Sequence, residues 1–179
     1  MNTRWKPSVT VAAVITQSFD GVEKFLLVEE ETRDGLRLNN PAGHLDPGES
    51  PEHGCARETL EETAYHFKPT ALVGVYMSRF ERVQANGILD ITYLRFAYCG
   101  ELGAHVEGQP LDEGIVRTVW LTADEIRASV ERHRSPLLRW RSTLARISSA
   151  VSHTVRTMPS SSGWPSTCAP SSPQNAKRR

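Results

Sequence analysis

Residues 41–65 read PAGHLDPGESPEHGCARETLEETAY, a loop rich in glycine and proline followed by an acidic helical segment. Glycine permits backbone angles that other residues resist, so this loop indicates that another group approaches its backbone closely. Ser50 and Pro51 are typical of a helix start, because serine caps free amides and proline suits the first helical position. The sequence therefore predicts a helix that begins at residue 51 and ends near residue 65.

Three acidic side chains share one face of this predicted helix. Glu58, Glu61 and Glu62 are spaced so that they lie about one turn from each other. Their repulsion costs roughly a few tenths of a kcal/mol per pair, whereas a hard divalent cation such as Mg²⁺ takes the same oxygens as ligands. A solvated helix face is the alternative interpretation. The preceding loop, and Arg57 four residues before Glu61, favour a metal site.

The rest of the chain predicts an α/β domain. Segments with strand-like patterns are residues 8–16, 25–29, 71–80, 89–98 and 116–121. Thr122, with Glu125 three residues later, predicts a capping box and a second helix to about residue 132. We expect a sheet of about five strands with a helix near each end. From residue 148 serine, proline and threonine dominate, so we expect a domain at 1–147 and a disordered tail at 148–179.

Composition excludes several classes of protein. Lys and Arg number 21, as do Asp and Glu, so no overall charge favours nucleic acid or an anionic membrane as partner. No apolar run approaches the roughly 20 residues that a membrane span needs. The 3 cysteines include no CxxC pair, which argues against a zinc site and suits reduced thiols in the cytoplasm. Oligomeric state is not readable from these features.

A family pattern emerges from the spacing of these residues. Gly43 is followed after five residues by Glu49, and after seven more by RETLEE at residues 57–62. This pattern resembles the Nudix box, and its loop-then-helix context is the one that the motif needs. The resemblance covers roughly residues 7–136. PAGHL at residues 41–45 and RSPL at 134–137 are similar to the phosphatase NudJ branch of that family.

The resemblance implies a Nudix fold, with a mixed β-sheet sandwiched between α-helices. It also implies hydrolysis by metal-activated water that attacks a phosphorus atom. Glu58, Glu61 and Glu62 would then hold Mg²⁺, or Mn²⁺ as a substitute, with the Ala42 carbonyl as a further ligand. Glu58 is alternatively the general base. Candidate residues that orient this site are Gly43, Glu49 and Arg57.

A general base from outside the motif is expected from the loop LDEG at residues 111–114. Glu113 is the first candidate and Asp112 the second, and two solvated loop acids are the alternative. Ala64 stands where the family pattern has glycine in a left-handed helix cap, which costs roughly 1 kcal/mol. Thr59 occupies a usually apolar position, where its hydroxyl can bond back to its own helix.

Substrate choice is expected to depend on His44, Arg79 and Tyr76, although each also has a plain structural interpretation. The NudJ-like resemblance implies a small phosphorylated substrate. Nucleoside di- and triphosphates, hydroxymethylpyrimidine pyrophosphate and thiamine pyrophosphate are the candidates. The alternative function is a catalytically silent Nudix domain that binds or senses a nucleotide, against which the three intact glutamates argue.

Overall fold

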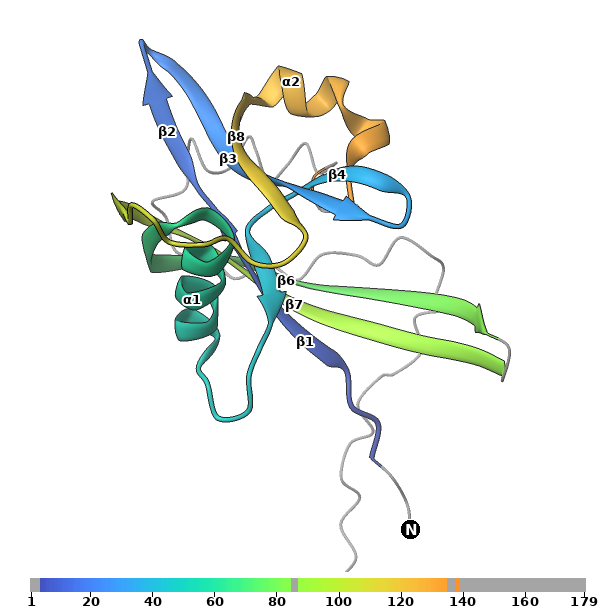
Figure 1. Ribbon diagram of the computed structural model, residues 1–179. Coiled ribbons are helices and arrows are strands. Elements are labelled where there is room, and N and C mark those ends of the chain that lie inside the picture. Colours follow the sequence, from blue (N-terminus) through green and yellow to red (C-terminus); the bar gives the residue numbers. More distant parts are fainter. Residues whose placement is uncertain (1–3, 85–86, 135–137, 139–179) are drawn as a thin grey trace, which may run out of the picture.

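The structure is a computed structural model that describes residues 4–84, 87–134 and 138. Its strands are β1 (Ser8–Val14), β2 (Thr16–Phe19), β3 (Val22–Thr32), β4 (Gly35–Asn39), β5 (Ala42–His44), β6 (Tyr65–Gln84), β7 (Gly87–His105) and β8 (Ile115–Thr122). Its helices are α1 (Pro51–Thr63), α2 (Ala123–Ala128) and the short 3-10 turn η1 (Val130–Arg132). Figure 1 shows α1 and α2 on different sides of the strands.

The strands form two four-stranded sheets. In the first, called sheet A, the order is β5-β1-β7-β6, with β1 and β7 parallel and the other neighbours antiparallel. In the second, sheet B, β3 pairs antiparallel with β2, β4 and β8. The chain passes from sheet A to sheet B at Ile15, between β1 and β2, so one extended segment serves both sheets.

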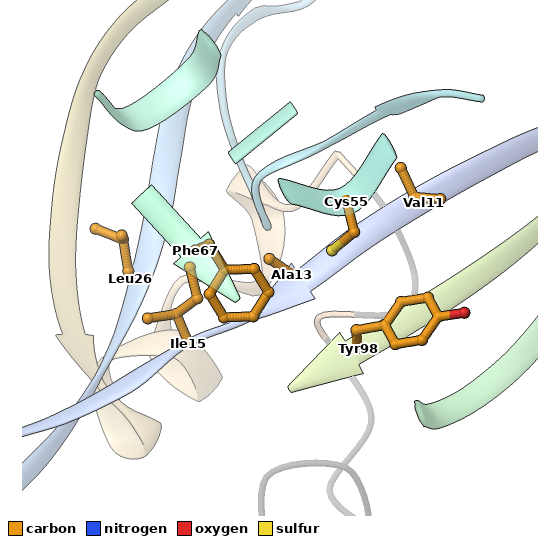
Figure 2. Packing of buried hydrophobic residues seen from close by; sticks show 7 residues of the cluster. All are labelled: Val11, Ala13, Ile15, Leu26, Cys55, Phe67 and Tyr98. Atoms are coloured by element: carbon orange, nitrogen blue, oxygen red, sulfur yellow. The ribbon is translucent and has the colours of Figure 1, made fainter. Parts of the chain in front are cut away.

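Strand β1 of sheet A is buried on both faces, and its side chains alternate between them. Val11, Ala13 and Ile15 point to one face and pack with Cys55 of α1 and with Phe67 (Figure 2). On the other face Val14 of β1 and Ala97 of β7 pack with Phe25, Leu27 and Leu38 of sheet B. Helix α1 therefore covers one side of sheet A, and sheet B covers part of the other.

The predicted α/β architecture, with a mixed sheet and packed helices, is confirmed. The expected count of about five strands is wrong, because within the described residues eight strands form two sheets. Strands β2, β4 and β5 were missed: β2 has only 4 residues, and β5 has only 3 and lies inside the glycine- and proline-rich stretch. The second helix is also shorter than expected: α2 ends at Ala128 and a 3-10 turn continues to Arg132.

Local signals within the helices are confirmed. The Ser50 hydroxyl caps α1 by accepting a hydrogen bond from the His53 amide at 3.2 Å, and Thr122 and Glu125 form the predicted capping box. The Thr59 hydroxyl donates to the Cys55 carbonyl at 2.7 Å, as expected for a threonine that bonds back to its own helix. The predicted tail and its boundary at residue 147 lie outside the described residues.

Candidate active site

Helix α1 and strand β5 meet at the point where Gly43 faces Glu58. A Cβ placed on Gly43 would lie 2.0 Å from the Glu58 carboxyl carbon and 2.0 Å from its Oε2, so any side chain at this position would displace the carboxylate. The close approach that the sequence indicated for this loop is therefore the approach of a carboxylate. Glu58 is only 8% exposed. Its burial raises the pKa of its carboxyl above the ordinary value, although Arg57 acts in the opposite direction.

Arg57 joins the loop to the helix through a network of charged hydrogen bonds. Its Nε and Nη2 each donate to the Glu49 carboxylate at 3.1 Å, which is the two-pronged geometry that arginine favours. Its Nη1 donates to Glu58 at 2.9 Å and to Glu61 at 2.8 Å, and its Nη2 to the His44 carbonyl at 3.0 Å. Arg57 thus fixes the orientations of three carboxylates at once.

Glu62 bonds to the backbone of the edge strand β5. Its Oε2 accepts a hydrogen bond from the Ala42 amide at 2.8 Å. Burial raises the pKa of Glu62 to about 8, and the neighbouring charges of Glu58, Glu30 and Asp112 act in the same direction. The ionised form of such a carboxyl is therefore unfavourable unless a cation lies near it.

The Ala42 carbonyl faces away from β1. The Ala13 amide donates to Pro41 and the Leu45 amide donates to Val9, so the hydrogen-bonded pairs of β1 and β5 fall on every second residue. Ala42 lies between these pairs, and both its amide and its carbonyl point outward from β1, the amide to Glu62. This orientation is the one required of a backbone ligand beside Glu62.

Asp112, from the loop before β8, completes a group of carboxylates with the helix. Oxygen atoms of Glu58, Glu61 and Asp112 all lie within 4.8 Å of one another. The Asp112 amide also donates to the Glu61 carbonyl at 3.0 Å, which anchors the loop to α1. Among the described residues, this group includes Asp112 but not its neighbour Glu113, which is exposed.

The predicted substrate residues separate into two sets. His44 and Tyr76 lie in one line across sheet A, because His44 pairs with Thr10, Thr10 with Arg95, and Arg95 with Tyr76. Paired residues present their side chains on the same face of a sheet. Neither Thr10 nor Arg95 was singled out from the sequence, although an arginine inside the strand sequence ITYLRFAYC is a detectable signal.

Arg79 belongs to the second set. Strand alternation puts it on the face of β6 opposite to Tyr76. Its Nε and Nη2 donate to the two oxygens of Asp90 at 2.7 Å each, and Glu81 lies within 3.2 Å. The structure therefore does not bring Arg79 together with His44 and Tyr76, and its substrate role stays a prediction.

The fold and the carboxylate site are those of a hydrolase, and comparison with known proteins identifies the family. The sequence profile of the NUDIX domain matches residues 6–141. The chain belongs to the Nudix family and is a pyrophosphohydrolase that acts on phosphorus-containing acid anhydrides. Within residues 4–84, 87–134 and 138, no helix is long and apolar enough to cross a membrane.

Three relatives illustrate the likeness. Phosphatase NudJ of Escherichia coli strain K12 is 36% identical over 135 residues, which cover 75% of this chain and 80% of that protein. The solved NUDIX hydrolase from Nitrosomonas europaea is 44% identical with a TM-score of 0.67, covering 80% of this chain and 89% of that one. The MutT protein from Methanosarcina mazei Go1 shares the fold, with a TM-score of 0.59 at 22% identity over 82% of this chain and 99% of its own.

Proposed function

We propose that this chain is a magnesium-dependent hydrolase of nucleoside di- and triphosphates and related pyrophosphates. The observation that carries the proposal is the group of oxygens from Glu58, Glu61 and Asp112, all within 4.8 Å of one another. Two of these carboxylates come from α1 and the third from a loop about fifty residues later, so the fold itself assembles them.

The residues present fit a hard divalent cation. Carboxylate and carbonyl oxygens are the ligands that Mg²⁺ prefers, and it keeps several positions for water and substrate phosphates. Glu62 and Glu58 have raised pKa values in the metal-free protein, because they are buried beside other acids. A cation reverses the sign of that interaction. We infer that Glu58, Glu61, Glu62 and Asp112 hold Mg²⁺ or Mn²⁺, with the Ala42 carbonyl as a further ligand.

Each part of the chain then has a defined task. When bound, Mg²⁺ supplies Lewis-acid chemistry, polarising the phosphate group and lowering the pKa of a coordinated water. Arg57 holds Glu58 and Glu61 in orientation, and is itself held by Glu49. Gly43 leaves room for the Glu58 carboxylate. Glu113 stays our first candidate for the general base, with Glu58 and Asp112 as the others.

The substrate class is supported by the likeness to Phosphatase NudJ at 36% identity. We propose that the chain accepts nucleoside di- and triphosphates and also hydroxymethylpyrimidine or thiamine pyrophosphate, and that inorganic phosphate is a product. His44 and Tyr76 lie in one row across sheet A, on the face opposite to α1, and are the proposed contacts for the organic part. We further propose a domain at 1–147, a tail at 148–179 and a cytoplasmic location, in keeping with the free thiols of Cys55 and Cys99.

The alternative, a silent domain that only senses a nucleotide, has no such observation in its favour. A sensor has no need to keep three carboxylates close together against their repulsion, and Arg57 orients two of them. The assembled carboxylates therefore favour catalysis.

A substrate panel tests the proposal. The wild-type protein is incubated with ADP, ATP, hydroxymethylpyrimidine pyrophosphate and thiamine pyrophosphate, with Mg²⁺ or EDTA, and released phosphate is measured. We expect turnover with Mg²⁺ on at least one of these compounds and none with EDTA. Glu61→Gln should lower turnover by about tenfold to hundredfold or more, whereas Glu107→Gln, an exposed glutamate at another site, should not. No turnover of any compound by the wild-type protein would exclude this function.

A further inference from the structure

Four side chains form a line across one face of sheet A. They come from four neighbouring strands in direct register, and this transverse row consists of His44, Thr10, Arg95 and Tyr76. Its first member lies on β5, the strand whose Ala42 amide bonds to Glu62. The row therefore begins beside the proposed metal ligands and runs away from them over the sheet.

The next row along the sheet is made of small residues. It consists of Ala42, Ala12, Ala97 and Gly74, each paired with its neighbour. At one end of it the Tyr76 ring lies over Gly74, because a Cβ on Gly74 would be 3.0 Å from the Tyr76 hydroxyl oxygen. This second row is buried: Ala12 and Ala97 are each 4% exposed, and Ala97 packs in the core between sheets A and B.

Arg95 is the cation in the middle of this row. Its Nε donates a hydrogen bond to the Thr10 hydroxyl at 3.1 Å, and Thr10 is only 3% exposed, so the base of the guanidinium is fixed. Within the described residues, Arg95 forms no ion pair with a carboxylate within 4.0 Å. Its two terminal nitrogens therefore remain able to donate to a ligand.

Arg95 interacts with the charges of a second arginine, Arg134, and of the acids Glu62 and Glu30. Burial lowers the pKa of Arg95, the positive charge of Arg134 lowers it further, and the negative charges of Glu62 and Glu30 raise it. Arg134 is itself bonded to Glu30. Two guanidinium groups thus lie near each other beside the carboxylate of Glu62, an arrangement that an anion stabilises.

Buried acceptors in this region also lack partners. Glu30 Oε1 and Asn39 Oδ1 are buried, in residues that are each 5% exposed, and neither has a hydrogen-bond partner in the described part of the chain. An unpaired buried acceptor costs about 1–3 kcal/mol, so such groups are normally satisfied by a partner. Around Arg95 the protein therefore offers both donors and acceptors for polar groups of a bound molecule.

We infer that Arg95 is a substrate-binding residue that holds a non-bridging phosphate oxygen of the pyrophosphate group with its terminal nitrogens, while Thr10 fixes its orientation. The inference rests on the proposed function, because the same substrate must also reach Glu58, Glu61 and Asp112. Arginine suits this task, since its planar fork matches two oxygens of one phosphate group. The organic part of the substrate then lies toward Tyr76, the neighbour of Arg95 in the row.

The test measures binding of imidodiphosphate, a pyrophosphate analogue whose P–N–P bridge resists hydrolysis, by calorimetry with Mg²⁺ present. Arg95→Met keeps the length of the side chain and removes its charge and donors. We expect its Kd to rise about tenfold to hundredfold, and the KM for ADP to rise with it while kcat changes less. Arg95→Lys keeps the charge but not the planar fork of the guanidinium group. Its Kd should lie between those of the wild-type protein and Arg95→Met.

A matched control is Arg127→Met, which removes an arginine that pairs with Asp124 on the exposed surface of α2. It should keep the wild-type Kd and KM. Thr10→Val, which preserves shape and removes the acceptor of the Arg95 Nε, should raise Kd severalfold, and it decides the question if Arg95→Met does not fold. Wild-type affinity in the folded Arg95→Met protein, or no binding to the wild-type protein, would overturn the inference.

The two proposals can fail separately. If the wild-type protein hydrolyses the panel but Arg95→Met and Thr10→Val bind imidodiphosphate normally, only the role of Arg95 is wrong. If the wild-type protein turns nothing over but binds imidodiphosphate in a way that depends on Arg95, only the catalytic proposal is wrong.

Discussion

Gly43 and Glu58 are in such close contact that the glycine determines where the carboxylate lies. The Glu58 carboxyl carbon occupies a point 2.0 Å from where a Gly43 Cβ would be. Contacts below 3.0 Å are not sustained by real side chains, so one of the two groups must move when a methyl is added. Strand β5 also bonds to Glu62 through Ala42, so any movement of β5 disturbs a second proposed ligand.

Gly43→Ala should therefore damage activity more than stability. We expect kcat with Mg²⁺ to fall by about tenfold to hundredfold, as for groups that orient metal ligands, and the Mg²⁺ concentration for half-maximal rate to rise. The control is Gly21→Ala, at a turn with φ 81° and open space around it. It should lower the melting temperature and leave kcat unchanged. Equal kcat in both variants would contradict the role given to Gly43.

Replacing Arg57 by lysine tests whether orientation rather than charge matters. Lysine keeps the positive charge, but it cannot bond Glu49 through two nitrogens while reaching Glu58 and Glu61. We expect a fall in kcat of about tenfold to hundredfold. Glu49→Gln should reproduce part of this fall, because it leaves Arg57 without its charged partner. Steady-state kinetics at saturating Mg²⁺ measure both, and wild-type kcat in Arg57→Lys would refute the idea.

The raised pKa of Glu62 predicts how the metal-free protein responds to pH. The folded pKa is about 8 against an ordinary value of 4.5, so the folded state favours the protonated form. The stability from this group is complete below about pH 4.5 and is lost as pH rises through about 8. The melting temperature in EDTA should therefore fall over this interval. Glu62→Gln should flatten that fall, and a profile with an unchanged slope would argue against the raised pKa.

The sequence predicted the helix well because its signals are local. Ser50, Pro51 and the spacing from Glu58 to Glu62 depend only on neighbours within a few turns. The left-handed conformation at Ala64, with φ 58°, was expected from the resemblance to the family pattern, which has glycine at this position.

Features that depend on distant contacts could not be predicted. The 3 residues of β5 form a strand only because β1 lies beside them. The sequence does not show which loop acid turns toward α1, and only the folded structure brings an Asp112 oxygen within 4.8 Å of those of Glu58 and Glu61. The position of Arg95 between Thr10 and Tyr76 is known only from the register of β1, β7 and β6.

The left-handed helix cap offers a way to stabilise the protein. Ala64→Gly relieves an unfavourable conformation, and we expect stabilisation of up to about 1 kcal/mol, less a contribution from the buried methyl that is lost. Ala56→Gly is the matched control in the interior of α1, where the same change should destabilise by about 1 kcal/mol. Urea unfolding measures both, and effects of the same sign would contradict the assignment of the cap.

The loop before β8 supplies two acids whose roles can be separated by their response to Mg²⁺ and to pH. Asp112 lies with Glu58 and Glu61, so Asp112→Asn should raise the Mg²⁺ concentration needed for half-maximal rate by about tenfold or more. If Glu113 is the general base, Glu113→Gln should leave that concentration unchanged, lower kcat by about a hundredfold and remove the acidic limb of the pH–rate profile. If Glu113→Gln keeps full turnover across the pH range, the base is not Glu113. Because Asp112 lies close enough to Glu58 to raise its pKa, the Asp112→Asn profile should then shift to lower pH if Glu58 is the base.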